Sequence, residues 1–387
     1  MYNKKLLFIA LALGVTAISC KKKGCTDITA NNYNEEAKKD DGSCTYDPPA
    51  PLDVPSTYAF TDDAGNNTVS YSGQTDRLNQ LEELTTYAKS GTGAVVDADI
   101  MKAMFRNTGD NGGGNFSFSS SKQLKNKCFA TDTAFFIAAF DSVAVASVDY
   151  ATTASNGQAG TLTSGTSTYL VAANGIEYAQ IIDKGLMGAV FLNQALTTYF
   201  GSGKMDVDNT APEDPGAGKY YTEMEHHWDE AFGYFGAPID FPTSTSSLRF
   251  WAKYCNKVND YITTISADIM LAFRTGRAAI SAGDLTTRDA QITIIRQLWE
   301  KVSARQAVSY FNDALGYFGT DNAKYVHALS EGWAFVNSLK YVPLETRVIS
   351  FTQITDILDT DLGDNFWDIT TTDLNNAITS LNTIYNF

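Results

Sequence analysis

The chain's three histidines lie in two short segments that share one pattern of residue types. Segments 226–234 and 327–335 each read histidine, three residues, glutamate, a small residue, an aromatic residue, one residue and a second aromatic residue. On a helix, the positions i, i+4 and i+8 of this pattern lie on one face. The aromatic residue indicates that this face points inward, so each segment is predicted to bury an imidazole beside a carboxylate.

Buried imidazole and carboxylate groups need partners, because leaving either one unpaired in an apolar interior costs several kcal/mol. The imidazole and the carboxylate of one segment must therefore bind each other, the groups of the other segment, or a metal ion. Imidazole nitrogen suits zinc, iron, copper and nickel, and added carboxylates favour iron or zinc. The predicted ligands of such a divalent ion are His226, His227, Glu230, His327, Glu331 and Glu177.

A third segment supplies the last of these carboxylates. Glu177, Gln180 and Lys184 share one face of a predicted helix, and Glu177 is a candidate partner for either histidine pair. The same stripe is also typical of an exposed or helix-packing face. Gly185 and Gly188 follow in an apolar helix, where glycine weakens the helix unless it lets another helix approach closely.

Two further interpretations of the histidine pairs remain open. In the first, the pairs are structural: a hydrogen-bonded imidazole and carboxylate fix the register of two helices in an envelope protein that binds a partner or nothing. In the second, the protein is a metallopeptidase, which needs about three metal ligands, an open position and a general base. The His-Glu-x-x-His helix and the Gly-x-Ser-x-Gly elbow are both absent, so we predict no catalytic residue and favour binding over catalysis.

The elements that position these residues are predicted to be helices. Helical periodicity dominates from about residue 74 to the C-terminus, and no stretch alternates with period two for long enough to predict a sheet. The sequence therefore predicts an all-α fold of packed helical bundles. Helices are expected at 74–89, 98–106, 131–152, 175–201, 221–235, 248–281, 287–317, 321–341, 348–358 and 371–385, with polar glycine-rich loops at 109–115, 155–168 and 201–219.

Composition limits the class of protein. The 387 residues are 44% hydrophobic and 12% aromatic, which is typical of a globular chain. A formal net charge of -15 would repel phosphate backbones, so the composition argues against nucleic acid as a partner.

Residues 1–19 have the composition of a signal peptide. Lys4 and Lys5 precede an apolar stretch at 6–18, which is too short to span about 30 Å of hydrocarbon as a helix. Residues 17–20, Ala-Ile-Ser-Cys, resemble the lipobox of bacterial lipoproteins, which implies cleavage before Cys20 and its lipidation. The expected partner is then the outer membrane, reached through the acyl chains. In the lipoproteins that this segment resembles, an acidic run after the cysteine often accompanies display on the cell surface; lysines stand at 21–23 instead, so we expect the periplasmic face.

Residues 20–47 form a predicted N-terminal module, followed by a proline-rich tether at 48–56. Cys25 and Cys44 are expected to form a disulfide in an oxidising compartment. Their segment resembles a short calcium-associated repeat of secreted bacterial proteins, with the pattern Cys-Thr-Asp, Ala-x-Asn-Tyr and Asp-Asp-Gly-Ser-Cys. The spacing of an EF-hand is absent, so a disulfide-closed group of turns is the alternative to calcium. The candidate calcium ligands are Asp27, Asn32, Asn34, Asp40 and Asp41.

Segments 223–236, 175–178 and 184–189 resemble a family of uncharacterised bacterial lipoproteins related to the imelysins. The imelysin motif is Gly-x-His-x-x-Glu; His227 and Glu230 match its last part, and Glu225 stands in the place of glycine. The resemblance implies two helical bundles in a pseudo-repeat, here 57–240 and 241–387. It also implies a link to iron uptake, and one branch of imelysin-like proteins is classed as a metallopeptidase.

These residues and segments lead to one expectation and its alternatives. We expect an envelope lipoprotein that binds a metal ion, or a small metal-bearing ligand, at the seam of two bundles. The structural or partner-binding protein and the metallopeptidase are the alternatives. The pairing of Cys128 with Cys255 is left open, because spacing does not decide between a second disulfide and two thiols.

Overall fold

The computed structural model describes residues 21–46 and 51–387, and the chain divides into two compact units, Met1–Pro51 and Leu52–Phe387. In the first unit the predicted disulfide between Cys25 and Cys44 is confirmed, with an S–S distance of 2.07 Å. The predictions for the signal peptide and for lipidation of Cys20 lie outside the described residues, as do residues 48–50 of the tether.

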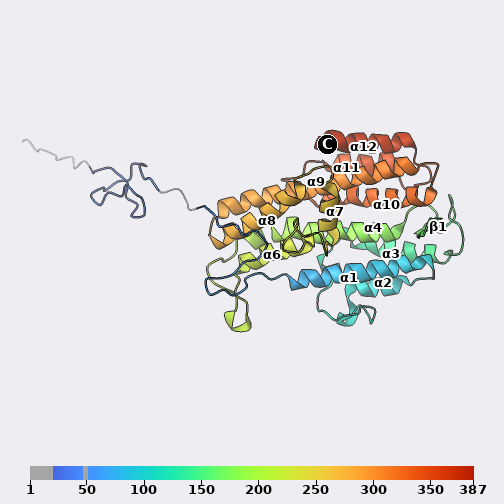
Figure 1. Ribbon diagram of the computed structural model, residues 1–387, viewed down its shortest axis with the longest axis horizontal. Helices are drawn as coiled ribbons and strands as arrows, with labels where there is room; N and C mark the ends of the chain where they lie inside the picture. Colours follow the sequence, from blue (N-terminus) through green and yellow to red (C-terminus); the bar gives the residue numbers. More distant parts are fainter. Residues whose placement is uncertain (1–20, 47–50) are drawn as a thin grey trace, which may run out of the picture. The chain divides into compact units, whose positions relative to one another are not determined.

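The second unit is helical, as predicted (Figure 1). Residues 51–387 contain one two-stranded sheet, β1 (Gly160–Ser164) and β2 (Ser167–Val171), and twelve α-helices. The helices are α1 (Ser72–Lys89), α2 (Ala98–Arg106), α3 (Thr133–Ser147), α4 (Tyr178–Leu186), α5 (Ser202–Met205), α6 (Glu223–Phe235), α7 (Phe250–Val258), α8 (Ile265–Ser281), α9 (Leu285–Tyr317), α10 (Asn322–Ser338), α11 (Phe351–Thr355) and α12 (Thr371–Tyr385).

The strand pair corrects the expectation of an irregular loop at 155–168. β1 and β2 are antiparallel, with Gly160 opposite Val171 and Ser164 opposite Ser167. The turn between them begins at Gly165, whose φ of 58° is readily adopted by glycine. The threonines of this segment were interpreted as part of a polar loop, although threonine favours strands.

A long helical segment from α4 to Tyr199 lies at the centre of the second unit. α4 continues through two π-helical turns, η5 (Met187–Leu192) and η6 (Gln194–Tyr199). α3 and α10 pack on α4, and α6 packs on η6. The close approach expected at the helix glycines is found: a Cβ atom on Gly188 would lie 2.2 Å from the Oγ of Ser338 in α10. Gly188 therefore lets α10 approach this central segment closely.

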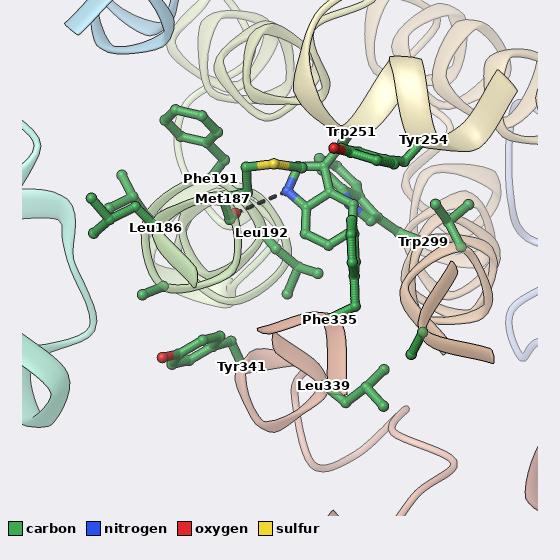
Figure 2. Close-up of a cluster of buried hydrophobic side chains, with 14 of the residues drawn as sticks. Leu186, Met187, Phe191, Leu192, Trp251, Tyr254, Trp299, Phe335, Leu339 and Tyr341 are labelled. Carbon is green, nitrogen blue, oxygen red and sulfur yellow. Dashed lines mark hydrogen bonds between the residues drawn. The ribbon is translucent and has the colours of Figure 1, made fainter. Parts of the chain in front are cut away.

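The hydrophobic core extends through most helices of the second unit, and one part of it lies between the central segment and helices α7, α9 and α10. Figure 2 shows Trp251 of α7 pointing toward the central segment, where its indole Nε1 donates a hydrogen bond of 2.9 Å to the carbonyl oxygen of Met187. Trp251, Trp299 and Phe335 are fully buried there and meet edge to face. This large aromatic core fixes the positions of α7 and α10, which both carry residues of the candidate site.

One predicted helix, 248–281, is interrupted. The structure has α7 and α8 there, separated by residues 259–264, and the side chain of Asn259 accepts a hydrogen bond from the backbone N–H of Ser266. Asparagine side chains commonly compete in this way with the backbone bonds of a continuous helix.

The residues predicted as two bundles form one compact unit, in which α10 packs directly on α4. The division at residue 240 into pseudo-repeated halves stays a prediction. Among the described residues, Ala130–Ser147 is apolar and long enough to pass a test for a membrane span, a test that core helices also pass. This stretch includes α3, which packs on α4 and α2.

Candidate functional site

The two histidine-bearing helices pack on opposite ends of the central segment. α10 packs on α4, whose first residue follows Glu177, and α6 packs on η6, whose last residue is Tyr199. We call the groups around His227 and Glu230 the α6 cluster, and those around His327, Glu331 and Glu177 the α10 cluster. In Figure 1, α6 lies toward one end of the helical unit and β1, which contacts α10, lies at the other.

The α6 cluster is closed by hydrogen bonds. His227 Nδ1 donates to Glu230 Oε2 at 3.3 Å, and its Nε2 accepts from Lys204 Nζ at 3.2 Å. The other carboxylate oxygen of Glu230 accepts from Gln74 Nε2 at 2.9 Å and from the hydroxyl of Tyr199 at 3.0 Å. Each polar atom of this pair therefore already has a protein partner.

Burial and these contacts shift the pKa values of Glu230 and of the neighbouring His226. Burial alone would raise the pKa of Glu230, but the hydrogen bonds from His227, Gln74 and Tyr199 and the charge of His226 outweigh it and lower that pKa to about 2. His226 is not bonded to Glu230. Its Nδ1 donates to the carbonyl oxygen of Ser70 at 3.0 Å, and burial lowers its pKa.

A buried ion network anchors α6 from its other side, and sequence analysis did not detect it. Arg277 of α8 is fully buried; its Nε donates to Asp229 at 3.1 Å and one terminal nitrogen donates to Glu225 at 2.6 Å. Tyr58 donates to the same Asp229 oxygen at 2.7 Å. Burial raises the pKa of Asp229 to about 6, against the opposing charge of Arg277. Glu225, the residue in the place of the motif glycine, thus has a structural role.

In the α10 cluster one imidazole lies between two carboxylates. His327 Nδ1 donates to Glu177 Oε2 at 2.6 Å, and its Nε2 lies 3.4 Å from Glu331 Oε2. The ring of Tyr169 from β2 stacks on the imidazole at 4.3 Å between centroids. Burial would lower the pKa of His327, but the hydrogen bond and charge of Glu177, followed by the charge of Glu331, raise it above its ordinary value. The structure thus pairs Glu177 with His327 rather than with His226 or His227.

Lys184 links this cluster to the carboxylate of Asp183. Its ammonium group is buried, 2.6 Å from Asp183 and 3.4 Å from Glu331, and Asp183 also lies 3.2 Å from Lys89. Burial would lower the pKa of Lys184, but the charge of Asp183 and further negative groups raise it well above its ordinary value. Lys184 therefore remains a cation beside His327.

The α10 cluster opens into a cavity of about 440 Å³, which we call the His327 cavity. This volume lies in the range of small-molecule sites. Its wall contains residues from α1, β2, α4, α7, α9 and α10: Lys89, Tyr169, Gln180, Lys184, Lys253, Tyr254, Lys257, Tyr310, Asp313, Tyr317, Lys324, His327, Ala328 and Glu331. A smaller cavity of about 220 Å³ shares Lys89, Lys184, Lys253 and Tyr254 with it.

The structure does not bring the two histidine segments together. No hydrogen bond, ion pair or ring contact between described residues joins His226 or His227 to His327. Our expectation that both pairs meet at one seam is therefore wrong, because the two helices pack on different ends of segment 178–199. Within residues 21–46 and 51–387, no group of three or more His, Cys, Asp or Glu side chains is arranged to hold a metal ion.

The candidate calcium ligands of the first unit take part in local turns. One Asp27 oxygen accepts from the N–H and hydroxyl of Thr29, and the other accepts from Tyr46. The remaining side chains accept backbone N–H groups in the same way, Asn32 from Thr45, Asn34 from Glu36, Asp40 from Gly42 and Asp41 from Ser43. These bonds account for the turns without a cation.

Cys128 and Cys255 are both buried and unpaired, so the second unit holds two thiols rather than the disulfide that spacing allowed. Burial raises the pKa of each thiol to about 12. Neither thiol belongs to the wall of the His327 cavity.

Comparison with known proteins gives a family and no function. The domain of unknown function DUF4856 matches residues 55–387, which is nearly all of the helical unit that carries both clusters. No curated protein and no solved structure matches the chain. The chain therefore belongs to the DUF4856 family.

Proposed function

We propose that this protein is an envelope lipoprotein that binds a small ligand in the His327 cavity and passes it on without chemical change. The observation that carries this proposal is the cavity itself, about 440 Å³ in volume and lined by His327 and Glu331. A concave site with a few convergent polar groups and perturbed pKa values is typical of ligand binding. Lipidation at Cys20 and the periplasmic face belong to the same proposal, supported by the lipobox-like residues 17–20.

The ligand named by our sequence expectation is a metal ion or a small metal-bearing molecule, with iron or zinc as the metal. His327 supplies one imidazole, and Glu177 and Glu331 supply two carboxylates that each contact it. A bare cation would have to displace those contacts and approach Lys184, which lies 3.4 Å from Glu331. The arrangement therefore favours a metal carried in a molecule over a bare ion.

The α6 cluster supports a structural role instead. Glu230 already receives hydrogen bonds from His227, Gln74 and Tyr199, so a ligand would gain no free acceptor there. We propose that this pair fixes α6 against η6 and α1. The relation to imelysins rests on the match of His227 and Glu230 to the motif, and the calcium-associated repeat rests on the pattern between Cys25 and Cys44; both are proposals.

Native mass spectrometry of the purified protein, with metal analysis of the same sample, tests the proposed function. We expect a bound small molecule that is lost in His327→Ala and retained in the matched variant His227→Ala. Loss of the ligand in neither variant would contradict a site at His327. Stoichiometric iron or zinc that persists after small molecules are dialysed away would favour a bare ion, and chelator-sensitive cleavage of unfolded substrates would favour the metallopeptidase.

A further inference from the structure

The His327 cavity concentrates positive charge in a strongly acidic protein. Five of its wall residues are lysines, whereas the whole chain has a formal net charge of -15. The carboxylates in the wall are Asp313 and Glu331; in addition, Asp183 contacts the wall residue Lys184, and Glu177 contacts the wall residue His327. Such a local reversal of sign attracts anions, and low-dielectric walls strengthen the attraction.

Three of the lysines form no direct ion pair with a carboxylate in the part of the chain that the structure describes. Lys184 and Lys89 pair with Asp183, whereas Lys253, Lys257 and Lys324 form no ion pair in residues 21–46 and 51–387. Partial burial, and then the positive charges of Lys184 and Lys257, lower the pKa of Lys253. The charges of Asp183 and Glu331 act on Lys253, and that of Lys257 acts on Asp313, but none of the three ammonium groups is held in a direct ion pair among the described residues.

Tyrosine rings, rather than carboxylates, hold several of these ammonium groups at the cavity. Lys257 Nζ lies 5.3 Å from the ring centre of Tyr254 and 6.0 Å from that of Tyr310. Lys324 Nζ lies 5.1 Å from the ring centre of Tyr317. An aromatic face stabilises a cation without cancelling its charge, so these lysines remain available to an anion from outside the protein.

The wall also contains an acceptor without a donor. Gln180 is 4% exposed; its amide nitrogen donates to Glu177 at 3.2 Å, but its carbonyl oxygen Oε1 has no hydrogen-bond partner in the described structure. A buried acceptor without a donor destabilises the protein, and a donor group brought into the cavity beside Gln180 would relieve part of that destabilisation. An anion without hydroxyl groups would not supply this donor.

We infer that the ligand of the His327 cavity is a small hydroxylated organic anion with two or more acidic groups, held by Lys253, Lys257 and Lys324. This inference rests on the proposed function and names the class of its ligand. Polycarboxylic hydroxy acids and acidic sugars share this chemistry, and the tyrosine rings in the wall offer flat faces to a sugar ring.

Isothermal titration calorimetry of the purified protein tests the inference, with citrate, a galacturonic acid disaccharide and the neutral galactose disaccharide as probes. We expect at least one acid to bind, more weakly at high salt, and the neutral sugar to bind at least about tenfold more weakly. In the triple variant Lys253→Gln/Lys257→Gln/Lys324→Gln, we expect acid binding to weaken about tenfold or more. The matched variant Lys122→Gln/Lys125→Gln/Lys301→Gln removes the same charge outside the cavity wall and should bind as the wild type does.

Each outcome separates this inference from the proposed function. Binding of an acid but not of the neutral disaccharide, with loss of that binding in the cavity variant only, supports the inference. Whether citrate or the galacturonic acid disaccharide binds then shows which of the two kinds of anion fits the cavity. Equal binding of the neutral disaccharide, equal loss in both triple variants, or no binding of either acid would overturn it. The proposed function is judged separately by the native ligand in the His327→Ala and His227→Ala comparison, which does not depend on any added probe.

Discussion

The α6 and α10 clusters contain the same residue types on helices that pack on the same central segment, yet only one of them is open. Glu230 is held by three side chains from its own helix, α1 and η6, and the Arg277 network anchors the same helix from behind. His327 and Glu331 line a cavity of about 440 Å³. A histidine and glutamate pair is therefore not a site in itself; what surrounds the pair decides whether it stabilises the fold or binds a ligand.

The largest expected difference between the two regions concerns their buried cations. Arg277→Met leaves Asp229 and Glu225 buried without their cation, and we expect it to lower the free energy of unfolding by about 3–5 kcal/mol. Lys184→Met should lower it by only about 1–2 kcal/mol, because Asp183 retains Lys89 at 3.2 Å. Urea unfolding of both variants checks this, and an equal loss would mean that the α10 cluster is as closed as the α6 cluster.

The second difference is the response of stability to acid. The folded-state pKa of Glu230, about 2, lies below its ordinary value of 4.5, so the unfolded chain takes up the proton first as the pH falls. The stabilisation by Glu230, on the order of 3 kcal/mol, is present above about pH 4.5 and is lost as the pH falls toward 2.

Urea unfolding of the wild type and Glu230→Gln from pH 6 to pH 3 measures this loss. The gap in unfolding free energy should be largest at pH 6 and should shrink as the pH falls. A gap that stays constant over this range would show that the charge of Glu230 is not stabilised by His227, Gln74 and Tyr199.

A third comparison uses the two glutamines. Gln74→Leu removes the 2.9 Å hydrogen bond to Glu230, so we expect a loss of about 1–2 kcal/mol in unfolding free energy. Gln180→Leu removes an unpaired oxygen together with one 3.2 Å bond to Glu177, so the loss should be no more than about 1 kcal/mol. Ligand affinity should fall more in Gln180→Leu than in Gln74→Leu. Thermal unfolding with and without ligand measures both the stability and the ligand affinity of each variant.

The smallest effect is expected in the titration of the histidines by NMR. His327 should titrate above its ordinary pKa of 6.5 because Glu177 and Glu331 stabilise the imidazolium, and His226 should titrate below 6.5 because it is buried. Stability from His327 is then present below about pH 6.5 and is lost as the pH rises through its folded-state pKa. The variants His327→Gln and His226→Gln assign the two signals, and a reversed order would remove the electrostatic distinction between the clusters.

Sequence reasoning predicted local structure better than it predicted the partners of each residue. Helix α2 lies at 98–106 as expected, and Gly185 and Gly188 mark close contacts, with Phe136 and Ser338 respectively. The β hairpin was missed because its threonines and serines were interpreted as a polar loop. Spacing correctly put histidine and glutamate on shared helices but had no information on which end of the central segment each helix would contact.

Spacing singled out Lys184, on one helix face with Glu177 and Gln180, but it could not have shown that the other lysines belong to the His327 cavity. Lys89, Lys253 and Lys324 belong to α1, α7 and α10, and only tertiary packing brings them to one wall. No periodic pattern connects residues so far apart in the sequence.

The two unpaired sulfhydryl groups of the helical unit can report, through chemical labelling, how often its helices separate. Cys128 is 8% exposed and Cys255 is fully enclosed, and the remaining cysteines of the described chain are already joined to each other. A maleimide reagent can therefore reach Cys255 only when the helices around it separate. The labelling rate at that position measures how often the interior opens, and a ligand that closes the molecule more firmly will slow it.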